Sequence, residues 1–336
     1  MLLSHDKHVT FSPPKVALPQ LSASDFISNG EVFFVKAVVL RDYGGPDKLT
    51  YEEWPDPVAG GGQVLVRVSA AGVNPIDYKL RSGAMKAIMP LNFPAILGYD
   101  FSGVVRVVAP DVRDFAPGDK VFGRSASAYA QLVAADVVGI AKLPEKLALV
   151  DAAALPVISN TGEQLITKGT KIQHGQTVVI TGALGAVGRT AVWIARKAGA
   201  VVIAAVRGSQ VKAAAALEAN DVISLDTPAT LEKLGFIDAV ADTVGGKVGE
   251  MMIGKVKPGG VFATVVGSPA NAHLNPTVNV VMVQSAPDAA SIRAIGEDVA
   301  AGRLVIPVDR MLPLAEAASA HAAAEKGGIG KVLLIA

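Results

Sequence analysis

The chain has 336 residues, 51% of them hydrophobic, and its 31 Lys and Arg nearly balance its 30 Asp and Glu at a formal net charge of +1. Single hydrophobic cores stop growing at roughly 250 to 300 residues, so this length predicts two domains. No apolar run approaches the ~20 residues of a membrane span, and no block of like charge favours nucleic acid or an acidic membrane. The absence of cysteine excludes disulfides and cysteine-ligated metals. Together these features favour a soluble cytoplasmic protein with a small-molecule partner.

Residues 1–35 carry scattered Ser and Pro without a hydrophobic period, and we expect a flexible leader there. They have neither the charged start and apolar centre of a secretory signal nor the arginines of a transit peptide. Organellar targeting by this leader is the minor alternative to the cytoplasm.

Short β-branched runs cut by Gly and Pro follow, from "KAVVL" and "QVLVRVSAAGV" to "YAQLVAADVVGIAKL". This spacing predicts a small, mostly antiparallel β domain that ends near Leu143. A helix over Ala152–Thr167 would join it to the next domain.

From Thr177 the pattern changes to strand, turn and helix, repeated. Strands are predicted at "TVVITG", "VVIAAV", "DVISL", "DAVADTVG", "GGVFATVVG" and "VNVVMV", with helices over Ala186–Ala198 and near Gln210–Glu218. This alternation indicates a doubly wound parallel sheet with both faces covered. After Pro287 we predict a helix over Ala289–Ala301, an alanine-rich segment and a closing strand "GKVLLIA", which need not belong to that sheet.

A glycine turn follows the first of these strands, in "TVVITGALGAVGR". The dinucleotide fingerprint G-x-G-x-x-G falls on residues 183–188, with Ala183 in the first place and Gly185 and Gly188 in the others. Such glycines let the backbone approach a pyrophosphate at the N-terminus of the next helix. The surrounding strands and helix favour a dinucleotide site over a structural turn, and the spacing does not fit a P-loop.

The cofactor-selecting position lies ~20 residues beyond the turn, where the second strand ends at Arg207. We expect no carboxylate to be available at this strand end, whereas Arg207, Ser209 and Lys212 can donate to a 2′-phosphate. We therefore predict NADPH; the alternative is that these are ordinary solvated residues.

Six segments stand in order along the chain: "AAGVNPIDYKLRSG" (70–83), "PAILGYDFSGVV" (94–105), "FAPGDKVFG" (115–123), "TGALGAVG" (181–188), "DTVGG" (242–246) and "GGIGKVLL" (327–334). In these segments the chain resembles the medium-chain dehydrogenase/reductase superfamily, and within it the zinc-independent quinone oxidoreductases and enone (alkenal) reductases. The resemblance implies an α/β fold of a GroES-like β domain plus a Rossmann doubly wound parallel sheet. The leader would occupy residues 1–35, the catalytic domain residues 36–156 and 287–336, and the NADP-binding domain residues 157–286. It also implies a homodimer.

Zinc-dependent alcohol dehydrogenases of the same superfamily place a zinc-binding Cys at the position of Asn74 and a His-Glu pair at that of Tyr99-Asp100. Zinc needs N, S or carboxylate ligands at fixed spacing. The five histidines lie apart from these motifs, at His5, His8, His174, His273 and His321. We therefore expect no metal, and with it the loss of the usual means of alcohol oxidation.

Site residues are also implied by the resemblance. The catalytic candidates are Asn74, facing the nicotinamide ribose, and the phenols of Tyr78, Tyr99 and Tyr129, which could bind or protonate an enolate oxygen. An Asn-Pro turn is the alternative for Asn74, and packing is the alternative for Tyr78, because many relatives carry their tyrosine at the position of Lys79. The cofactor residues would be Thr161 near the nicotinamide, Gly185, Ala186, Val187 and Gly188 at the pyrophosphate, Arg207, Ser209 and Lys212 at the 2′-phosphate, Thr243, Val244, Val266 and Gly267 at strand ends, and Lys331 in the tail. For Thr243 and Val266 the alternative is packing.

These features predict an NADPH-dependent reductase that transfers hydride to quinones or α,β-unsaturated carbonyls without a metal. The alternatives are a non-catalytic NADPH-binding redox sensor or structural protein, and a metal-free alcohol dehydrogenase.

Overall fold

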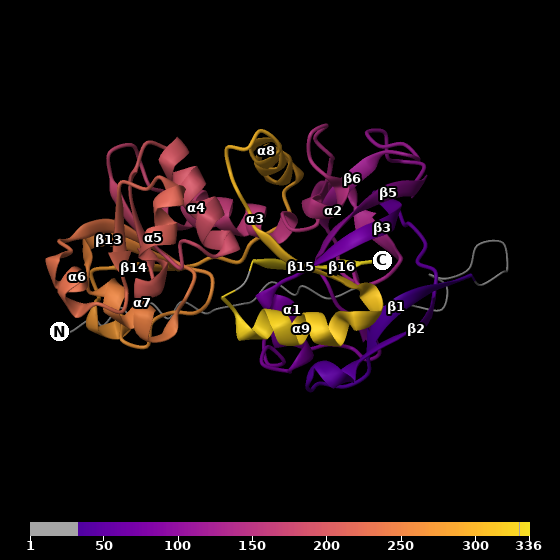
Figure 1. Cartoon of the computed structure of the whole chain (residues 1–336), viewed down its shortest axis with the longest axis horizontal. Coiled ribbons are helices and arrows are strands. Elements are labelled where there is room, and N and C mark those ends of the chain that lie inside the picture. The colour runs from indigo at the N-terminus through magenta and orange to yellow at the C-terminus, as the bar shows by residue number, and fades with distance from the viewer. Residues whose placement is uncertain (1–32, 329) are drawn as a thin grey trace, which may run out of the picture.

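The computed structural model describes residues 33–328 and 330–336, so nearly all of the predicted leader lies outside the described residues. Figure 1 shows two lobes, one built on a parallel sheet and one on antiparallel strands, with α3 (Pro156–Gln164) and α8 (Ala289–Ala300) between them. The predicted fold class is confirmed. Within the described part of the chain, no helix has both the length and the apolar character needed to cross a membrane.

The first lobe holds a seven-stranded sheet in the order β15-β16-β3-β5-β6-β8, with β7 paired to β3. All its pairs are antiparallel except β15 with β16, so the last strands of the chain join strands from its beginning. The strands are β3 (Gln63–Val73), β5 (Asp100–Val108), β6 (Lys120–Arg124), β7 (Leu132–Asp136), β8 (Ile140–Lys142), β15 (Val308–Pro313) and β16 (Lys331–Ile335).

A three-stranded sheet in the order β2-β1-β4 lies beside it, bridged to the larger sheet's connections at Ala37 and Ala130. Its strands are β1 (Phe34–Leu40), β2 (Leu49–Pro55) and β4 (Ala95–Ile96). Two helices cover this lobe, α1 (Pro75–Arg81) and α9 (Ala317–Lys326). Its core includes the fully buried side chains of Phe101, Tyr129 and Leu40.

The second lobe holds a six-stranded sheet in the order β11-β10-β9-β12-β13-β14, with every pair parallel. The strand order reverses between β9 and β12, and ligands of such sheets bind outside the carboxyl ends at this point. The strands are β9 (Thr177–Thr181), β10 (Val201–Val206), β11 (Asp221–Ser224), β12 (Ile237–Asp242), β13 (Val256–Thr264) and β14 (Asn279–Met282). The helices are α4 (Ala186–Lys197), α5 (Val211–Ala214), α6 (Pro228–Lys233) and α7 (Gly246–Ile253). Apolar clusters cover both faces of this sheet, as the predicted continuous apolar strands require.

The predicted helix over 152–167 is in fact three pieces: α2 (Leu149–Ala152), α3 (Pro156–Gln164) and the π-helix η4 (Leu165–Thr170). Pro156 explains the first break, because proline lacks an N–H and disfavours a helical residue before it. The predicted helix near 210–218 is likewise α5 between two short 3₁₀ turns, and it ends where Glu218 adopts a left-handed φ of 50°.

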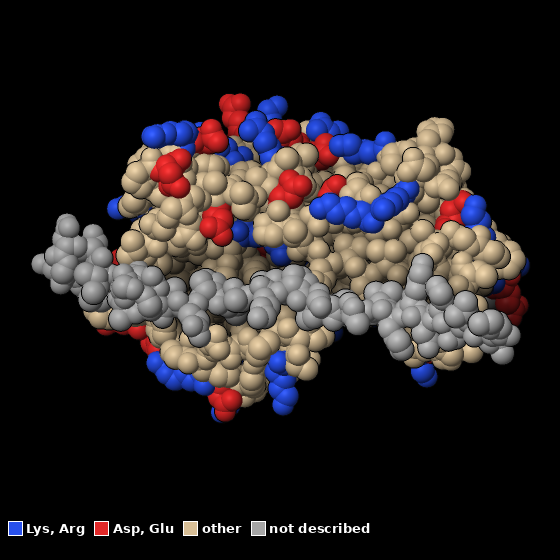
Figure 2. Space-filling view, turned by 180° about the vertical axis from the view of Figure 1, so that it is seen from behind, with Lys and Arg blue, Asp and Glu red and all other residues tan. Residues whose placement is uncertain are grey.

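The two 3₁₀ turns around α5 are η5 (Gly208–Gln210) and η6 (Ala215–Leu217), and the others are η2 (Pro46–Lys48), η3 (Val137–Gly139), η7 (Ala272–Leu274) and η8 (Leu314–Glu316). On the face drawn in Figure 2, basic and acidic side chains are interspersed rather than gathered into a field of one sign.

Candidate functional site

The glycine turn between β9 and α4 has the geometry that a pyrophosphate needs. Gly182 adopts a φ of 63°, which favours glycine. A Cβ placed on Gly188 would lie 2.2 Å from the carbonyl oxygen of Gly182, so only glycine lets α4 pack this closely. Gly185 is the exposed N-cap of α4, and the first N–H groups of such a helix have no partner within it. These residues fit a bound dinucleotide.

The rest of this turn divides between the surface and the core. Ala186 and Val187 are half-buried in the first turn of α4, whereas Ala183 is fully buried in the core of the parallel sheet. The methyl group that replaces the first glycine of the fingerprint therefore points into the core and does not narrow the approach of a ligand.

The predicted 2′-phosphate residues lie together at the end of β10. Arg207 and Ser209 are exposed just after the strand, and Lys212 is exposed on α5. The Arg207 Nη2 atom is 3.9 Å from where a Cβ on Gly328 would be, so this guanidinium lies near the loop before β16.

A carboxylate that sequence reasoning missed lies beside this group. The Gly208 N–H donates to Asp226 Oδ2 at 2.7 Å, and Asp226 is exposed just after β11. The expectation that no carboxylate is available here was wrong, because the parallel pairing of β10 with β11 aligns the two strand ends. The relevant signal was an acid at the end of the next strand along the chain.

Asp242 ties together the carboxyl ends of three strands. Its buried carboxylate accepts from Thr181 Oγ1 at 2.7 Å, from Thr264 Oγ1 at 2.9 Å, and from the N–H groups of Val244 and Gly245 at 3.1 and 3.0 Å. The sequence offered one signal for this role, which is an acid at the end of an otherwise apolar strand.

The four residues predicted at strand ends lie near this carboxylate, at the carboxyl ends of β12 and β13. They are Thr243, Val244, Val266 and Gly267. The Thr243 hydroxyl donates back to the Thr181 carbonyl at 2.7 Å, so that side chain serves packing between β9 and β12. Val244 and Val266 are 47% and 38% exposed beyond their strands, and Gly267 adopts a φ of 143°. The exposed side chains of Val244 and Val266 at the carboxyl end of the sheet are available to pack against an adenosine.

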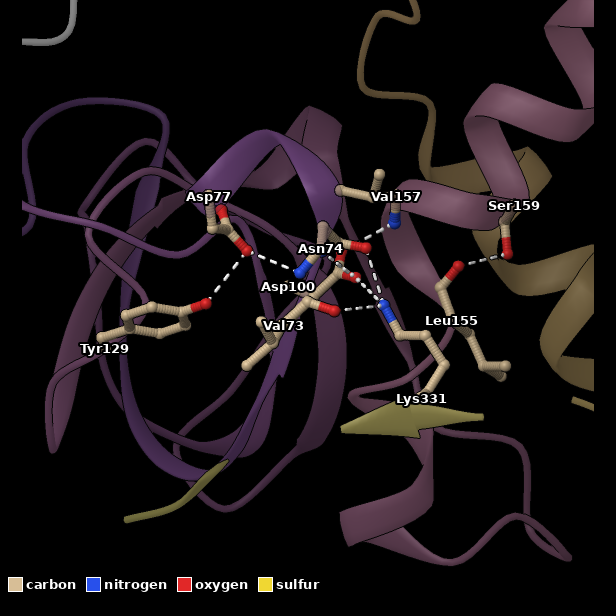
Figure 3. A network of polar contacts seen from close by, with 9 residues as sticks. All are labelled: Val73, Asn74, Asp77, Asp100, Tyr129, Leu155, Val157, Ser159 and Lys331. Carbon is tan, nitrogen blue, oxygen red and sulfur yellow. Dashed lines mark hydrogen bonds and ion pairs between the residues drawn. The ribbon is translucent and has the colours of Figure 1, made fainter. Parts of the chain in front are cut away.

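A second group of polar residues meets where the two lobes join, and Figure 3 shows its contacts. The Lys331 ammonium donates to Asn74 Oδ1 at 2.6 Å and to the Val73 carbonyl at 3.3 Å, and lies 3.4 Å from Asp100 Oδ2. The Asn74 amide donates to the same Asp100 oxygen at 2.8 Å. Antiparallel pairing of Val332 with Val73 brings Lys331 to Asn74. The Lys331 ammonium is therefore held by three protein oxygens.

Asp100 connects this group to α3. Its Oδ1 accepts from the N–H of Val157, in the first turn of α3, at 2.7 Å. Burial raises the pKa of Asp100, while Lys331, Asn74 and Val157 act in the opposite direction. One carboxylate thus joins β5, the last strand and the helix that enters the second lobe.

A chain of polar side chains supports Asn74 from the other side. Asp77 Oδ2 accepts from the Asn74 N–H at 2.8 Å and from the Tyr129 hydroxyl at 3.0 Å. Arg81 can only donate, so its 3.4 Å contact with His321 Nδ1 leaves Nε2 carrying the proton, which faces the Tyr129 oxygen at 3.3 Å. Burial is the main cause that lowers the pKa of His321 to about 3, so the ring is neutral.

Two expectations change with this arrangement. Tyr129 is fully buried and its hydroxyl is bonded to Asp77, which argues against a direct contact with substrate. His321 is buried on α9 against Tyr129 and Arg81, closer to the first motif than its distance along the sequence indicated.

The other two phenols differ from Tyr129. Tyr78 is half-buried on α1. The Tyr99 hydroxyl is buried and has no hydrogen-bond partner among the described residues. Burial, with a smaller effect of Asp77, raises the pKa of Tyr99 to about 12, so its phenol is protonated.

Thr161 leads to two residues that the sequence analysis did not identify. Its hydroxyl, on α3, donates to Ser285 Oγ at 2.9 Å. Arg124, at the end of β6, donates through Nη1 to the same Ser285 Oγ at 3.2 Å and to the Ser285 carbonyl at 3.3 Å. Neither residue lies in a recognisable motif, and only the fold brings them to Thr161.

Comparisons with known proteins agree with this architecture. Residues 60–145 match the alcohol dehydrogenase GroES-like domain, and residues 217–334 match a family described as zinc-binding dehydrogenase. A chloroplastic quinone-oxidoreductase homolog of Spinacia oleracea is 32% identical over 197 residues, 55% of this chain and 59% of that protein. The quinone oxidoreductase of Homo sapiens is 33% identical over 172 residues, 50% of this chain and 52% of that protein. The chain thus spans little more than half the length of these two curated relatives.

The likeness extends over a whole solved structure. The quinone oxidoreductase from Coxiella burnetii is 30% identical with a TM-score of 0.82, covering 90% of this chain and 100% of that one. The chain therefore belongs to the medium-chain dehydrogenase/reductase superfamily, in its quinone oxidoreductase-like group.

Proposed function

We propose that this protein is an NADPH-dependent reductase that transfers hydride to a quinone or an α,β-unsaturated carbonyl without a metal. The names of its relatives support this, including a 2-methylene-furan-3-one reductase of Solanum lycopersicum that is 29% identical over 252 residues. The dinucleotide turn supports the cofactor, and the polar group around Asn74 supports the chemistry.

The observation that carries the proposal is the Lys331 ammonium between Asn74 Oδ1, Val73 O and Asp100 Oδ2. By the resemblance, zinc-dependent members of the superfamily place a zinc-binding Cys at the position of Asn74 and a His-Glu pair at that of Tyr99-Asp100. Here an amide, a phenol and a carboxylate bonded to Lys331 stand there, and this donor set does not fit tetrahedral zinc. The Lys331 cation contacts the Asn74 and Asp100 oxygens, whereas the Tyr99 phenol has no partner among the described residues.

Bound NADPH would supply a hydride, and the protein would hold the cofactor and the acceptor in line. As the new C–H bond forms at the electron-poor carbon, the C=C electron pair moves toward the carbonyl oxygen and leaves it negatively charged. A proton then completes the product. Groups that face this oxygen with hydrogen-bond donors lower the barrier.

Among the three phenols we favour Tyr99 as the proton or hydrogen-bond donor. Its hydroxyl is buried without a partner among the described residues, and its raised pKa keeps it protonated. The Tyr129 hydroxyl already donates to Asp77. Tyr78 is more accessible, and solvent remains an alternative donor.

We propose NADPH rather than NADH because Arg207, Ser209 and Lys212 are exposed together after β10. A guanidinium offers phosphate a bidentate fork. Asp226, beside Gly208, opposes this preference through its negative charge. The preference therefore depends on the balance between one carboxylate and two cations.

The domain division at residues 156/157 and 286/287, a homodimer and a cytoplasmic location are further parts of the proposal. The first boundary falls at the start of α3 and the second between β14 and α8. The chain has no cysteine, which fits a reducing compartment. Light scattering on the purified protein tests the dimer.

The decisive experiment follows NADPH absorbance with a panel of quinones, alkenals, cyclic enones and simple ketones. We expect oxidation of NADPH with quinones or enones, slower oxidation of NADH, and no effect of a chelator on the rate. Absence of turnover with every quinone and enone, although NADPH binds, would refute the reductase and favour a non-catalytic NADPH-binding protein.

A further inference from the structure

Arg124, at the junction of the two lobes, uses only part of its hydrogen-bonding capacity among the described residues. Its Nη1 donates to the hydroxyl and the carbonyl of Ser285. Its Nε is buried without a partner, and Nη2 makes no hydrogen bond, among the residues that the structure describes. One edge of the guanidinium, formed by Nε and Nη2, is therefore free to donate.

The sheet places this free edge near the candidate site. Arg124 is directly opposite Asp100 in the antiparallel pairing of β5 with β6, and residues opposite each other point to the same face. Asp100 contacts Asn74 and Lys331 on that face. On the other side, Ser285 links Arg124 to Thr161 on α3. Arg124 thus lies between the Asn74 group and Thr161.

The charge of Arg124 is also without a direct partner. No carboxylate lies within salt-bridge distance of it in residues 33–328 or 330–336, although Asp100 is its neighbour, because Asp100 is bonded to Lys331, Asn74 and Val157. Burial lowers the pKa of Arg124, but a guanidinium stays charged in proteins. A partly buried cation with unused donors is costly unless an anion completes it.

We propose that the free Nε–Nη2 edge of Arg124 binds the oxygen of the substrate that becomes negatively charged, the enolate or hydroquinone oxygen. This inference rests on the proposed reductase function. Both donors can reach one oxygen, and the interaction strengthens as hydride arrives because the oxygen gains charge only then. Arg124 would be a catalytic residue, with Ser285 as the positioning residue that fixes its guanidinium.

The test measures binding of an oxyanion directly and needs no turnover. 4-Nitrophenol is titrated into the full-length protein saturated with NADP⁺, and the phenolate is followed by its absorbance. We expect the wild type to bind the phenolate in preference to the phenol, and R124M to bind it about tenfold to a hundredfold more weakly. R106M is the matched control, because Arg106 is exposed on the neighbouring strand β5, and we expect it to bind as the wild type does.

Three results would overturn the assignment. The first is a wild type with no preference for the phenolate, and the second is an R124M variant that binds the phenolate as tightly as the wild type. The third is an R124M variant whose loss of affinity is confined to NADP⁺. If R124M does not fold, as judged by circular dichroism, R124K decides. Lysine keeps the charge but lacks the fork, so we expect weaker phenolate binding, and unchanged binding would refute the role. Failure of the reductase proposal is seen separately, as absence of NADPH oxidation by the wild type.

Discussion

Replacing Asp77 with asparagine changes how the stability of the protein depends on pH. Asp77 is fully buried, and desolvation raises its pKa from 3.8 to about 7, against the hydrogen bonds from Asn74 and Tyr129. Since the folded-state pKa is the higher one, the stability that Asp77 contributes is complete below about pH 4 and is lost as the pH rises through about 7. A difference of about 3 pKa units corresponds to ~4 kcal/mol of unfolding free energy.

His321 hides this effect in the wild type. Its pKa is lowered from 6.5 to about 3, so its contribution is present above about pH 6.5 and is lost as the pH falls through about 3. Between about pH 4 and 6.5 the two groups change the stability in opposite directions. The wild-type curve alone is therefore flat compared with either contribution, and only a difference between variants isolates Asp77.

The assay is urea unfolding of D77N and wild type at intervals between pH 4 and 8. One amide oxygen can accept from Asn74 and Tyr129, and the NH₂ group takes the place of Oδ1, which has no partner in the described chain. D77N thus resembles protonated Asp77, and we expect its stability relative to wild type to rise by ~4 kcal/mol across this range. The control is D114N, at an exposed aspartate. If D77N and D114N give parallel curves, Asp77 is ionised at neutral pH and the reasoning is refuted.

Three further predictions concern the cofactor site and the buried histidine. Alanine at Arg207 should raise the Kd of NADPH about tenfold or more with little change in the Kd of NADH, and D226N should shift the ratio of the two affinities toward NADPH. Calorimetry measures both effects. Equal losses of affinity for the two cofactors in the Arg207 variant would contradict the assignment. G188A should lower the unfolding free energy by ~1–3 kcal/mol and weaken NADPH binding, because its Cβ would lie 2.2 Å from a backbone oxygen. G254A is its control, with open space at the Cβ and a φ of −69°. H321Q keeps both hydrogen bonds but no longer titrates, so its stability relative to wild type should rise between about pH 7 and pH 4, measured by denaturation at both. Equal acid sensitivity would show that His321 is not the group responsible.

The parallel lobe could be predicted from the sequence because its strands are buried on both faces and read as continuous apolar runs. The glycine turn was equally visible, since its positions follow from one local geometry. Pro156 carried the signal that a single helix over 152–167 is wrong, because proline disfavours a helical residue before it. Local chemistry was therefore sufficient for the strands of the parallel lobe and for the cofactor turn, but not for the bounds of every helix.

Contacts across the chain could not be predicted in the same way. Lys331 is 257 residues from Asn74, Arg124 is 161 residues from Ser285, and Asp226 meets Gly208 only because two strands pair in one register. No period or spacing in the sequence encodes such distances. The resemblance assigned Lys331 to the cofactor, and that assignment stays a prediction; the structure adds that its side chain is 7% exposed and that its ammonium faces three protein oxygens.

The Asn74 group has a consequence for how the site is assembled. Asp100 is fully buried and needs Lys331 to balance its charge, and Lys331 comes from β16, the last strand of the described chain. Removing one partner of a buried ion pair costs more than the pair contributes, because the other charge is left uncompensated. Until β16 pairs with β3, the Asp100 carboxylate and the N-terminal turn of α3 bonded to it therefore lack their cation. Pairing of β16 with β3 thus brings to the buried Asp100 carboxylate, which also binds the first turn of α3, the cation that balances its charge.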